Sequence, residues 1–319
     1  MRVLVTGANG FVGKHLVAAL SSAGHDVVAT SRSGGDGSQP LELPDLARAE
    51  ELLDEQRPDA IYHLAAVAEV PKADKDPVTA FRSNVDGTVS LLEGARRAHP
   101  STRFFFVSSS NVYGVVPVAE QPIAECRGYA PAGVYASSKV AAECWVRSYA
   151  NQLQSPPVIL RPFNHVGPGQ SPSYALPAFA RQIVEIENGA EPIVRVGNLE
   201  VRRDILDVRD VTRAYVRLLQ QPQLPPVLNV CAGRSYLLSE LLAQLCAASS
   251  ADVQVEVDPM RLRGNDLTLL EGDATQVRAA LEWSPQIPMH ETLRSLLTDW
   301  RSRMTASGSA TECHDRQGT

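Results

Sequence analysis

Near its N-terminus the chain reads Thr6-Gly7-Ala8-Asn9-Gly10-Phe11-Val12-Gly13, directly after the apolar run Arg2-Val3-Leu4-Val5. Residues 11–23 then carry apolar side chains at helical spacing. In this context the first glycine lets the chain turn off the strand, the second lets backbone approach a pyrophosphate, and the third lets the helix pack closely on the sheet. The N–H groups at the start of the helix would face the phosphates. This order of strand, turn and helix predicts a dinucleotide-binding site, although a Gly-rich turn taken alone is also consistent with a tight turn that binds nothing.

Strand-like and helix-like segments alternate through the first half of the chain. We expect strands at 3–5, 27–30, 60–64, 104–107 and 158–160, and helices at 11–23, 47–55, 78–98 and 134–151. This alternation predicts an α/β fold with a Rossmann-type, doubly wound parallel sheet. After residue 161, prolines and glycines interrupt the pattern, and a smaller mixed α/β region is expected at the C-terminal side.

The same pattern predicts how the chain is divided. Residues 1–165 form a dinucleotide-binding domain, to which 204–232 returns, and residues 166–203 and 233–304 form a substrate region. Residues 305–319 are small and polar, which predicts a disordered tail.

The composition excludes several classes of function. The chain has 319 residues, of which 44% are hydrophobic, enough to bury a core without disulfides or metal ions. Its formal net charge of -6 argues against non-specific binding of nucleic acid. The five cysteines are scattered and form no CxxC pair, so we expect free thiols, a reducing compartment and no metal site. We find neither a signal peptide nor an apolar run long enough to span a bilayer, and we therefore expect a cytoplasmic protein with no membrane partner.

The end of the second predicted strand bears on the choice of cofactor. NAD-binding folds usually place Asp or Glu here, where it binds the ribose hydroxyls. This chain has Thr30-Ser31-Arg32 instead. Because a guanidinium pairs with the 2′-phosphate that a carboxylate would repel, we favour NADPH, with NADH as the alternative. Arg32 is also consistent with an ordinary solvated loop residue. Glu42 and Leu43, near the next strand, are predicted to border the adenine.

Tyr135 and Lys139 are four residues apart and would share one face of a helix. A free phenol has a pKa of about 10 and transfers protons poorly at neutral pH, whereas a nearby ammonium stabilises the phenolate and lowers that pKa. Val107-Ser108-Ser109-Ser110 ends the fourth predicted strand, at the sheet edge where doubly wound folds bind ligands. We predict that Ser109 donates the hydrogen bond that orients a carbonyl, with Ser110 as the alternative. Tyr and Lys at this spacing often form only an exposed helix pair, so it is the combination with the Gly-rich turn that indicates hydride transfer.

Several segments together resemble a known family. Besides residues 6–13 and 135–139, they are His63-Leu64-Ala65-Ala66, Asn84-Val-Asp-Gly-Thr88 and Ser108-Ser109-Ser110-Asn111-Val112-Tyr113-Gly114. The chain to about residue 303 resembles the extended short-chain dehydrogenase/reductases that act on nucleotide sugars. The stretches Arg161-Pro162-Phe163-Asn164-His165-Val166-Gly167-Pro168-Gly169-Gln170 and Arg203-Asp204-Ile205-Leu206-Asp207 are most similar to members that reduce GDP-4-keto-6-deoxy-D-mannose to GDP-D-rhamnose, and less similar to GDP-mannose 4,6-dehydratases.

The resemblance implies roles for individual residues. Ser109, Tyr135 and Lys139 match the catalytic triad. Cofactor contacts are implied for Gly7, Asn9, Gly10, Phe11, Val12, Gly13, Ser31, Arg32, Glu42, Leu43, Leu64, Ala65, Ala66, Asn84, Tyr135, Lys139 and Pro162. Substrate contacts are implied for Ser110, Asn111 and Arg181, for Asn164, Arg203 and Arg263 at the phosphates, for Val194, Gly197 and Asn198 at the base, and for Asp266 at the nucleotide ribose. A homodimer through helices 78–98 and 134–151 is implied as well, although their apolar faces are equally explained by packing on the sheet.

The reaction type depends on the residue two positions after Ser109. Dehydratases of the family carry a Glu there, because they need an extra acid or base to expel water. Asn111 stands at that position, and an amide cannot act as a general base. Since a reductase needs only hydride delivery and one proton donor, we expect a reductase. Three alternatives stay open: a dehydratase that uses Glu69 or Glu120, a 4-epimerase with tightly bound NAD and the same triad, and a non-catalytic dinucleotide sensor.

Overall fold

The computed structural model describes residues 1–262 and 267–315, with side chains described to residue 305. The chain forms two compact units. The first contains Met1–Phe163, Val208–Gly233 and Glu271–Ser284, and the second contains the described parts of Asn164–Asp207, Arg234–Leu270 and Pro285–Thr319. The sequence assigned 164–165 and 204–207 to the first domain and all of 233–304 to the second region. The structure instead has 164–165 and 204–207 in the second unit, and 233 and 271–284 in the first. Residues 271–284 join the first unit through two backbone hydrogen bonds that Ile123 makes with Glu271 and Asp273, each 2.9 Å long.

Seven strands form one sheet in the first unit, in the order β10-β6-β5-β4-β1-β2-β3, and every neighbouring pair is parallel. This arrangement confirms the predicted doubly wound sheet. The strand β3 has no counterpart in the sequence pattern, because it is only two residues long and contains a proline that is tolerated at a sheet edge. The strands are β1 (Arg2–Thr6), β2 (Asp26–Ser31), β3 (Gln39–Pro40), β4 (Ala60–His63), β5 (Arg103–Val107), β6 (Val158–Pro162) and β10 (Val227–Val230).

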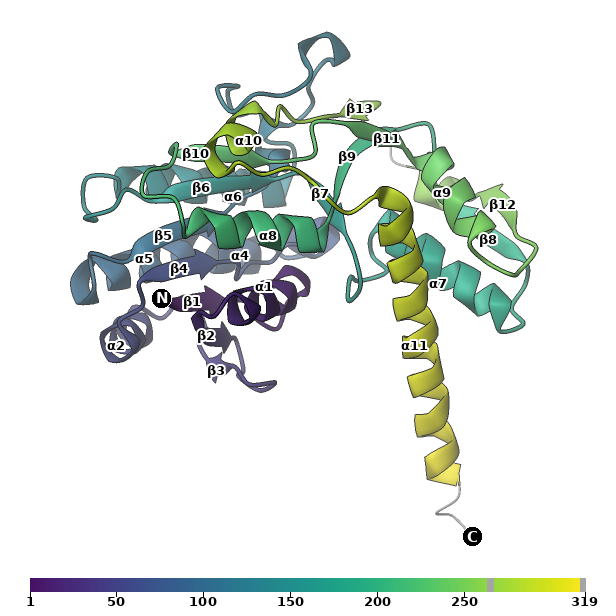
Figure 1. Cartoon of the computed structure of the whole chain (residues 1–319), viewed down its shortest axis with the longest axis horizontal. Helices are drawn as coiled ribbons and strands as arrows, with labels where there is room; N and C mark the ends of the chain where they lie inside the picture. Colours follow the sequence, from purple (N-terminus) through teal and green to yellow (C-terminus); the bar gives the residue numbers. More distant parts are fainter. Residues whose placement is uncertain (263–266, 316–319) are drawn as a thin grey trace. The chain divides into compact units, whose positions relative to one another are not determined.

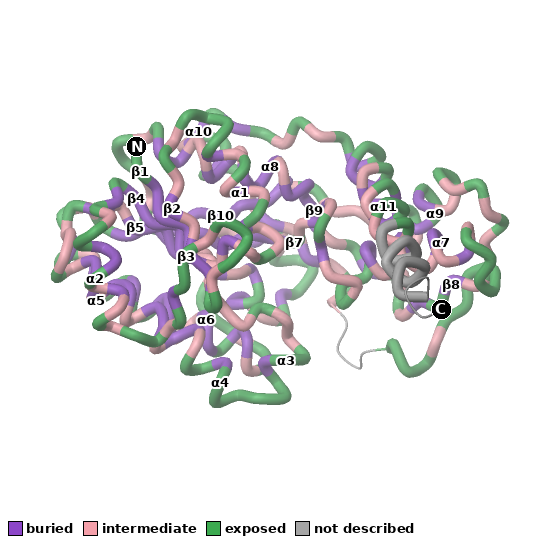
Figure 2. Tube along the Cα trace, turned by 90° about the horizontal axis from the view of Figure 1, so that it is seen from below, coloured by how far each residue is buried: buried purple, intermediate pink, exposed green. Residues whose placement is uncertain are grey.

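Helices cover both faces of this sheet (Figure 1). On one face α1 packs against α8, and on the other α2 packs against α5, which in turn contacts α6. The strands between these layers are buried, as the purple segments of β1, β4 and β5 show in Figure 2. The helices are α1 (Phe11–Ser22), α2 (Leu46–Gln56), α3 (Val70–Lys75), α4 (Pro77–Phe81), α5 (Gly87–Ala98), α6 (Val134–Ser148), α8 (Val208–Leu218) and α10 (Thr275–Leu281), with 3₁₀ turns η2 (Ser110–Tyr113) and η3 (Val118–Glu120).

The helix expected at 78–98 is interrupted. The chain forms α4, then one π-helical turn η1 (Arg82–Asp86), then α5. A π turn inserts one extra residue into a helix, and such turns are often found at functional sites. Hydrophobic periodicity did not indicate this turn, because a single π turn shifts the helical spacing by only one position.

The second unit is smaller and mixed, as predicted. In one sheet β9 (Arg202–Asp207) pairs with β7 (Asn164–Val166), β11 (Ser235–Leu237) and β13 (Leu269–Leu270), and in another β8 (Ile193–Val196) pairs with β12 (Gln254–Val257). Its core lies between α7 (Ala175–Glu187), α9 (Leu238–Ala247) and α11 (Met289–Asp315), and η4 (Pro259–Arg261) is a 3₁₀ turn. α11 continues through residues 305–315, where the composition predicted a disordered tail, and no proline stops the helix in this stretch.

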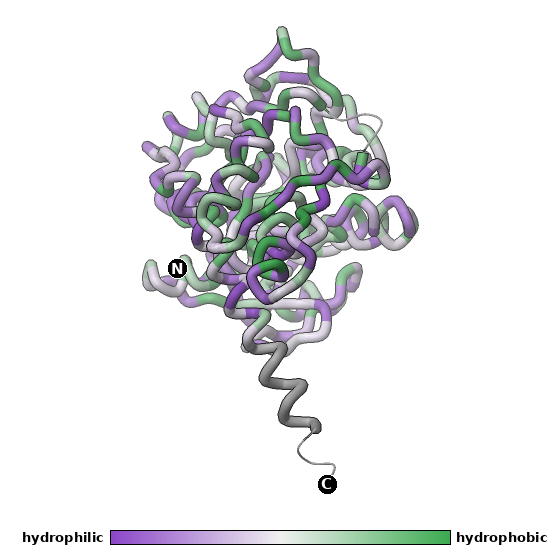
Figure 3. Tube along the Cα trace, turned by 90° about the vertical axis from the view of Figure 1, so that its right-hand side faces the viewer, coloured by the Kyte–Doolittle hydropathy of each residue, from purple (hydrophilic) through white to green (hydrophobic). Residues whose placement is uncertain are grey.

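Hydrophobic and hydrophilic residues are interspersed along the trace (Figure 3). Among the residues that the structure describes, no helix combines the length and the apolar character needed to cross a membrane.

Candidate active site

Two glycines shape the Gly-rich turn. Gly7 has a φ of +70°, which residues with a Cβ rarely adopt, and a Cβ here would lie 2.9 Å from the backbone N of Ala65. A Cβ on Gly13 would lie 2.2 Å from the carbonyl oxygen of Gly7. The first helix begins at Phe11-Val12, directly after Gly10, with no side-chain cap and no acidic residue in its first turn. A helix start of this kind, approached closely by glycine backbone, fits the pyrophosphate of a dinucleotide.

Asn9 connects this turn to the loop that follows β2. Its Nδ2 donates to Ser31 Oγ at 3.1 Å and to the carbonyl oxygen of Gly35 at 3.3 Å. Ser31 Oγ also lies 2.8 Å from Ser38 Oγ, which closes the loop on itself. Arg32, within the loop, is exposed and has no hydrogen bond or ion pair to another described residue. Its guanidinium is therefore available to a ligand.

The other predicted cofactor residues also lie in the first unit. Glu42 is exposed just after β3, and Leu43 packs against the core beside Gly87, where an added Cβ would lie 3.2 Å from the Leu43 Cβ. Leu64-Ala65-Ala66 is half-buried after β4, and Pro162 is buried at the end of β6, opposite Val230.

His63 joins three of these segments. Its Nε2 lies 3.1 Å from Thr88 Oγ1, whose own hydrogen goes to the carbonyl oxygen of Asn84 at 2.7 Å. Its Nδ1 lies 2.8 Å from Thr6 Oγ1, which accepts the N–H of Ala65 at 3.2 Å. Thr88 must therefore accept from Nε2, and Thr6 must donate to Nδ1, so the hydrogen bonds assign the neutral Nε2–H tautomer.

The environment of His63 keeps it neutral. Burial lowers its pKa to about 3, and the positive charge of Lys139 acts in the same direction. The sequence singled out His63 only as part of a family motif, and nothing in its pattern indicated that it links the Gly-rich turn to α5.

Asn84 lies in the π turn and is almost fully buried. Its Nδ2 donates to Ser138 Oγ at 2.9 Å and to the carbonyl oxygen of Val67 at 3.2 Å, while its Oδ1 accepts the N–H of Val67 at 2.7 Å. Both amide hydrogens are thus used within the protein. The role that the structure gives this residue is to hold the segment after Ala66 against α6.

The expected triad lies on α6 and at the end of β5. Tyr135 is nearly buried, in a small cluster with Ala73 and Ala80. Lys139, one turn later, is buried with its Nζ 2.8 Å from the carbonyl oxygen of Val107 and 4.9 Å from the centre of the Phe106 ring. Burial lowers the pKa of Lys139 to about 8, against the opposing charge of Glu143 further along the helix.

Ser109 follows this strand end and begins the turn η2. Its Oγ accepts the N–H of Asn111 at 3.2 Å, and Ser109 itself is only partly buried. Ser110 is buried, and Asn111 is exposed. The structure therefore brings Lys139 against the end of the strand that carries Ser109.

The residues predicted to bind substrate lie mainly in the second unit. Asn164 is exposed in β7, and Arg181 in α7 lies 3.4 Å from Glu185. Arg203 donates to the carbonyl oxygen of Leu267 at 2.5 Å.

Three more of the predicted substrate residues follow β8 or belong to it. A Cβ on Gly197 would lie 2.6 Å from the carbonyl oxygen of Arg261, and Asn198 Oδ1 accepts the N–H of Glu200 at 2.9 Å. Val194 is fully buried in the core, so only its backbone could meet a base. Arg263 and Asp266 fall outside the described residues.

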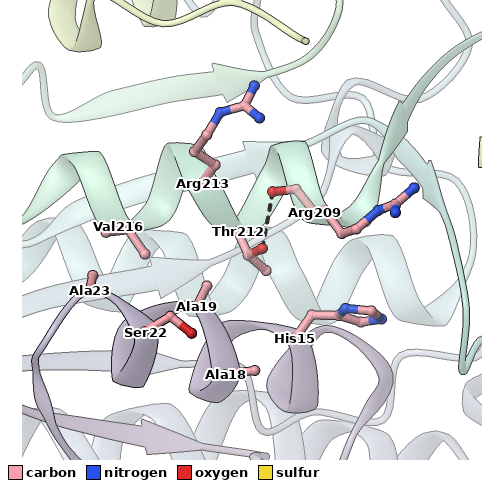
Figure 4. Close-up of a pocket in the computed structure, with 9 residues that line it drawn as sticks. All are labelled: His15, Ala18, Ala19, Ser22, Ala23, Arg209, Thr212, Arg213 and Val216. Carbon is pink, nitrogen blue, oxygen red and sulfur yellow. Dashed lines mark hydrogen bonds between the residues drawn. The ribbon is translucent and has the colours of Figure 1, made fainter. Parts of the chain in front are cut away.

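A surface groove of about 480 Å³ lies between α1 and α8 (Figure 4). Small side chains of α1 and of the residue that follows it form one wall: Ala18, Ala19, Ser22 and Ala23. None of the predicted site residues lines this groove, so it is separate from the candidate active site.

Comparison with known proteins identifies the family of this chain. The model of the NAD dependent epimerase/dehydratase family matches residues 3–231. The chain belongs to this family. Within it, GDP-6-deoxy-D-mannose reductase of Pseudomonas aeruginosa is 36% identical over 309 residues, which cover 95% of this chain and 98% of that protein. A UDP-glucose 4-epimerase of Mycolicibacterium smegmatis is 32% identical over 316 residues, which cover 95% and 99%.

A solved structure gives the same result. RMD from Pseudomonas aeruginosa, complexed with NADPH, matches with a TM-score of 0.83 and 35% identity, covering 95% of this chain and 99% of that one. This epimerase/dehydratase family member is therefore an extended short-chain dehydrogenase/reductase, an NAD(P)-dependent enzyme of the nucleotide-sugar oxidoreductase and epimerase group.

Proposed function

We propose that this enzyme reduces the 4-keto group of GDP-4-keto-6-deoxy-D-mannose with NADPH and forms GDP-D-rhamnose. The observation that carries the proposal is the similarity to GDP-6-deoxy-D-mannose reductase, which extends over 95% of the chain. The motifs quoted above favour the same substrate.

The cofactor and three side chains each have a separate role in the proposed reaction. The nicotinamide cofactor supplies the hydride. Tyr135 protonates the oxygen that develops negative charge, and Ser109 donates a hydrogen bond to that oxygen. Lys139 lies on the same helical face as Tyr135, where its charge favours the phenolate that remains. The glycines at 7 and 13 let the backbone pack closely around the start of α1, whose N–H groups would face the cofactor's pyrophosphate.

Three side chains argue against a dehydratase. Asn111 occupies the position of the extra acid or base and cannot ionise. Glu69 forms an ion pair with Lys72 at 2.7 Å. Glu120 forms an ion pair with Arg127. Both carboxylates that might replace the missing base are thus engaged on the protein surface.

Arg32 supports NADPH as the preferred cofactor. It is exposed, without a partner among the described residues, and follows β2, the strand whose end faces the adenosine ribose in this fold. A 2′-phosphate would give it a charge-assisted, bidentate partner. The related RMD structure is a complex with NADPH, which agrees with this choice.

Exposed apolar side chains support a homodimer. Val78 and Phe81 in α4 are 63% and 50% exposed, and Trp145 in α6 is 48% exposed. Val85 and Leu92 are instead buried, so packing in the first unit accounts for those two residues but not for the other three. We propose that α4 and α6 meet their counterparts in a second copy.

The decisive experiment incubates the purified enzyme with GDP-4-keto-6-deoxy-D-mannose and NADPH, with NADH in parallel, and follows the absorbance of the reduced cofactor. Loss of absorbance with a GDP-deoxyhexose product supports the reductase, and NMR then distinguishes rhamnose from talose. A 4-epimerase is the second candidate, because the Mycolicibacterium smegmatis relative is one. It predicts no net oxidation of the cofactor and a co-purifying NAD.

A further inference from the structure

A buried ion pair lies beside the end of β5. Arg161 and Glu143 form two parallel hydrogen bonds, from Nε to Oε1 at 3.0 Å and from Nη2 to Oε2 at 2.7 Å. Their side chains are 1% and 0% exposed. Burial alone would lower the pKa of the Arg161 guanidinium, but the hydrogen bond and the charge of Glu143 outweigh it and raise that pKa.

Other polar groups complete the coordination of both side chains. Arg161 Nη1 donates to the hydroxyl of Tyr113 at 2.9 Å, and its guanidinium lies 4.8 Å and 5.1 Å from the ring centres of Tyr113 and Tyr129. Each carboxylate oxygen of Glu143 also accepts one hydroxyl. Ser108 Oγ donates to Oε1 at 2.5 Å, and the Tyr129 hydroxyl donates to Oε2 at 2.8 Å.

A buried ion pair of this kind contributes little net free energy to the stability of a core. Replacing a buried ion pair by apolar residues is often neutral or stabilising, because both charges must be desolvated. The location of the pair suggests another role. Tyr135, Lys139 and Glu143 follow one another at intervals of four residues on the buried face of α6.

Two of these side chains hold consecutive residues of one strand end. Lys139 Nζ donates to the carbonyl oxygen of Val107 at 2.8 Å, and Glu143 accepts the hydroxyl of Ser108. The next residue is Ser109. The carboxylate of Glu143 is itself held in a fixed orientation by the two hydrogen bonds from Arg161.

We propose that Ser108, Glu143 and Arg161 form a positioning group for catalysis. This inference rests on the proposed reduction. None of the three residues is expected to contact the substrate. Arg161 orients Glu143, Glu143 orients Ser108, and Ser108 sets the place of Ser109 relative to Tyr135 and Lys139. Ser108 therefore acts on the reaction through its neighbour, although its own hydroxyl points to the ion pair.

The test compares two substitutions that each remove one hydroxyl from the same carboxylate. Ser108→Ala breaks the connection to β5, and Tyr129→Phe is the matched control, which leaves that connection intact. Because both leave Glu143 one donor short, a merely structural role would affect them alike. We measure kcat and KM in the reductase assay, together with amide hydrogen exchange of residues 107–113.

We expect Ser108→Ala to lower kcat by about 10- to 100-fold, since small displacements of a reacting group have effects of this size. Its KM should stay within about twofold of the wild-type value, because substrate binding is not touched. Exchange over 107–113 should become faster in this variant only, and Tyr129→Phe should keep kcat within about twofold. An unchanged kcat in Ser108→Ala, or an equal loss in both variants, would overturn the positioning role. The exchange measurement needs no substrate, so faster exchange in Ser108→Ala with no wild-type turnover would reject the proposed reduction alone, and unchanged exchange would reject the positioning role whatever the activity.

Discussion

Protonation of His63 should destabilise the first unit in mildly acidic solution. The side chain is 1% exposed, and its pKa falls from the usual 6.5 to about 3 because burial penalises the imidazolium. Its two ring nitrogens already have partners that suit the neutral tautomer. The unfolded chain therefore binds a proton between these two pKa values that the folded chain does not bind. By linkage, the free energy of unfolding falls as pH drops through 6.5 and continues to fall down to about 3.

The magnitude follows from the two pKa values. Between pH 7 and pH 5 the expected loss is about 2 kcal/mol, and the full loss, reached only below pH 3, is about 5 kcal/mol. The range from pH 7 to pH 5 is the useful one, because Glu93 changes the stability only at lower pH. Its hydrogen bond with Arg96 lowers its pKa to about 2, so its stabilising contribution is lost only below its usual pKa of 4.5. Urea unfolding followed by circular dichroism at pH 7, 6 and 5 measures the slope.

Two variants test whether His63 causes this slope. His63→Gln keeps a donor and an acceptor but cannot take up a proton, so it should lose about 2 kcal/mol less than wild type between pH 7 and pH 5. His25→Gln is the matched control. His25 is half-buried, and burial lowers its pKa in the same direction, so its removal should change the slope by less. If His63→Gln and wild type lose equal stability over this window, the argument from burial is refuted.

Three substitutions test the site and the assembly. Tyr135→Phe should lower kcat by about 10²- to 10⁴-fold, the usual contribution of a proton donor, and an unchanged rate in the reductase assay would rule out Tyr135 as that donor. Arg32→Ser should raise the KM for NADPH by about 10- to 100-fold and leave that for NADH unchanged, because a charge-assisted hydrogen bond contributes about 1.5–3 kcal/mol; equal effects on both cofactors would contradict the 2′-phosphate contact. Trp145→Glu should convert a dimer to a monomer in light scattering after gel filtration, whereas Val118→Glu, at a residue 57% exposed and outside α4 and α6, should not; a dimer that survives Trp145→Glu would place the interface elsewhere.

The sequence predicted the first unit well because its signals are local. Gly7 and Gly13 lie where backbone crowding excludes a Cβ, and the strands β1, β4, β5, β6 and β10 are short, mostly buried apolar runs. Two features of the first unit could not be predicted from local sequence signals. Asn84, in the π turn, makes hydrogen bonds to Val67 and Ser138, which lie 17 and 54 residues away in sequence. Residues 271–284 join the first unit through backbone pairing with Ile123, for which composition gives no signal.

The candidate site was predicted as a set of residue types, and the structure adds how they are held. The sequence could have indicated a role for Glu143. It lies on the same helical face as Tyr135 and Lys139, which was expected to point into the protein, and a glutamate is seldom fully buried without a partner. Arg161 could not, since its partner lies on another element and no spacing connects them. The sequence thus identifies residues that meet ligands better than the residues that support them.

His63 and Lys139 explain each other's ionisation. The ammonium of Lys139 disfavours a second positive charge nearby, which contributes to the low pKa of His63. A neutral His63 in turn adds no repulsion to Lys139, whose pKa burial has already lowered to about 8. A protonated imidazole would lower it further and weaken the charge that favours the Tyr135 phenolate. Thr6, at the start of the Gly-rich turn, donates to His63 Nδ1, a contact that suits the neutral imidazole.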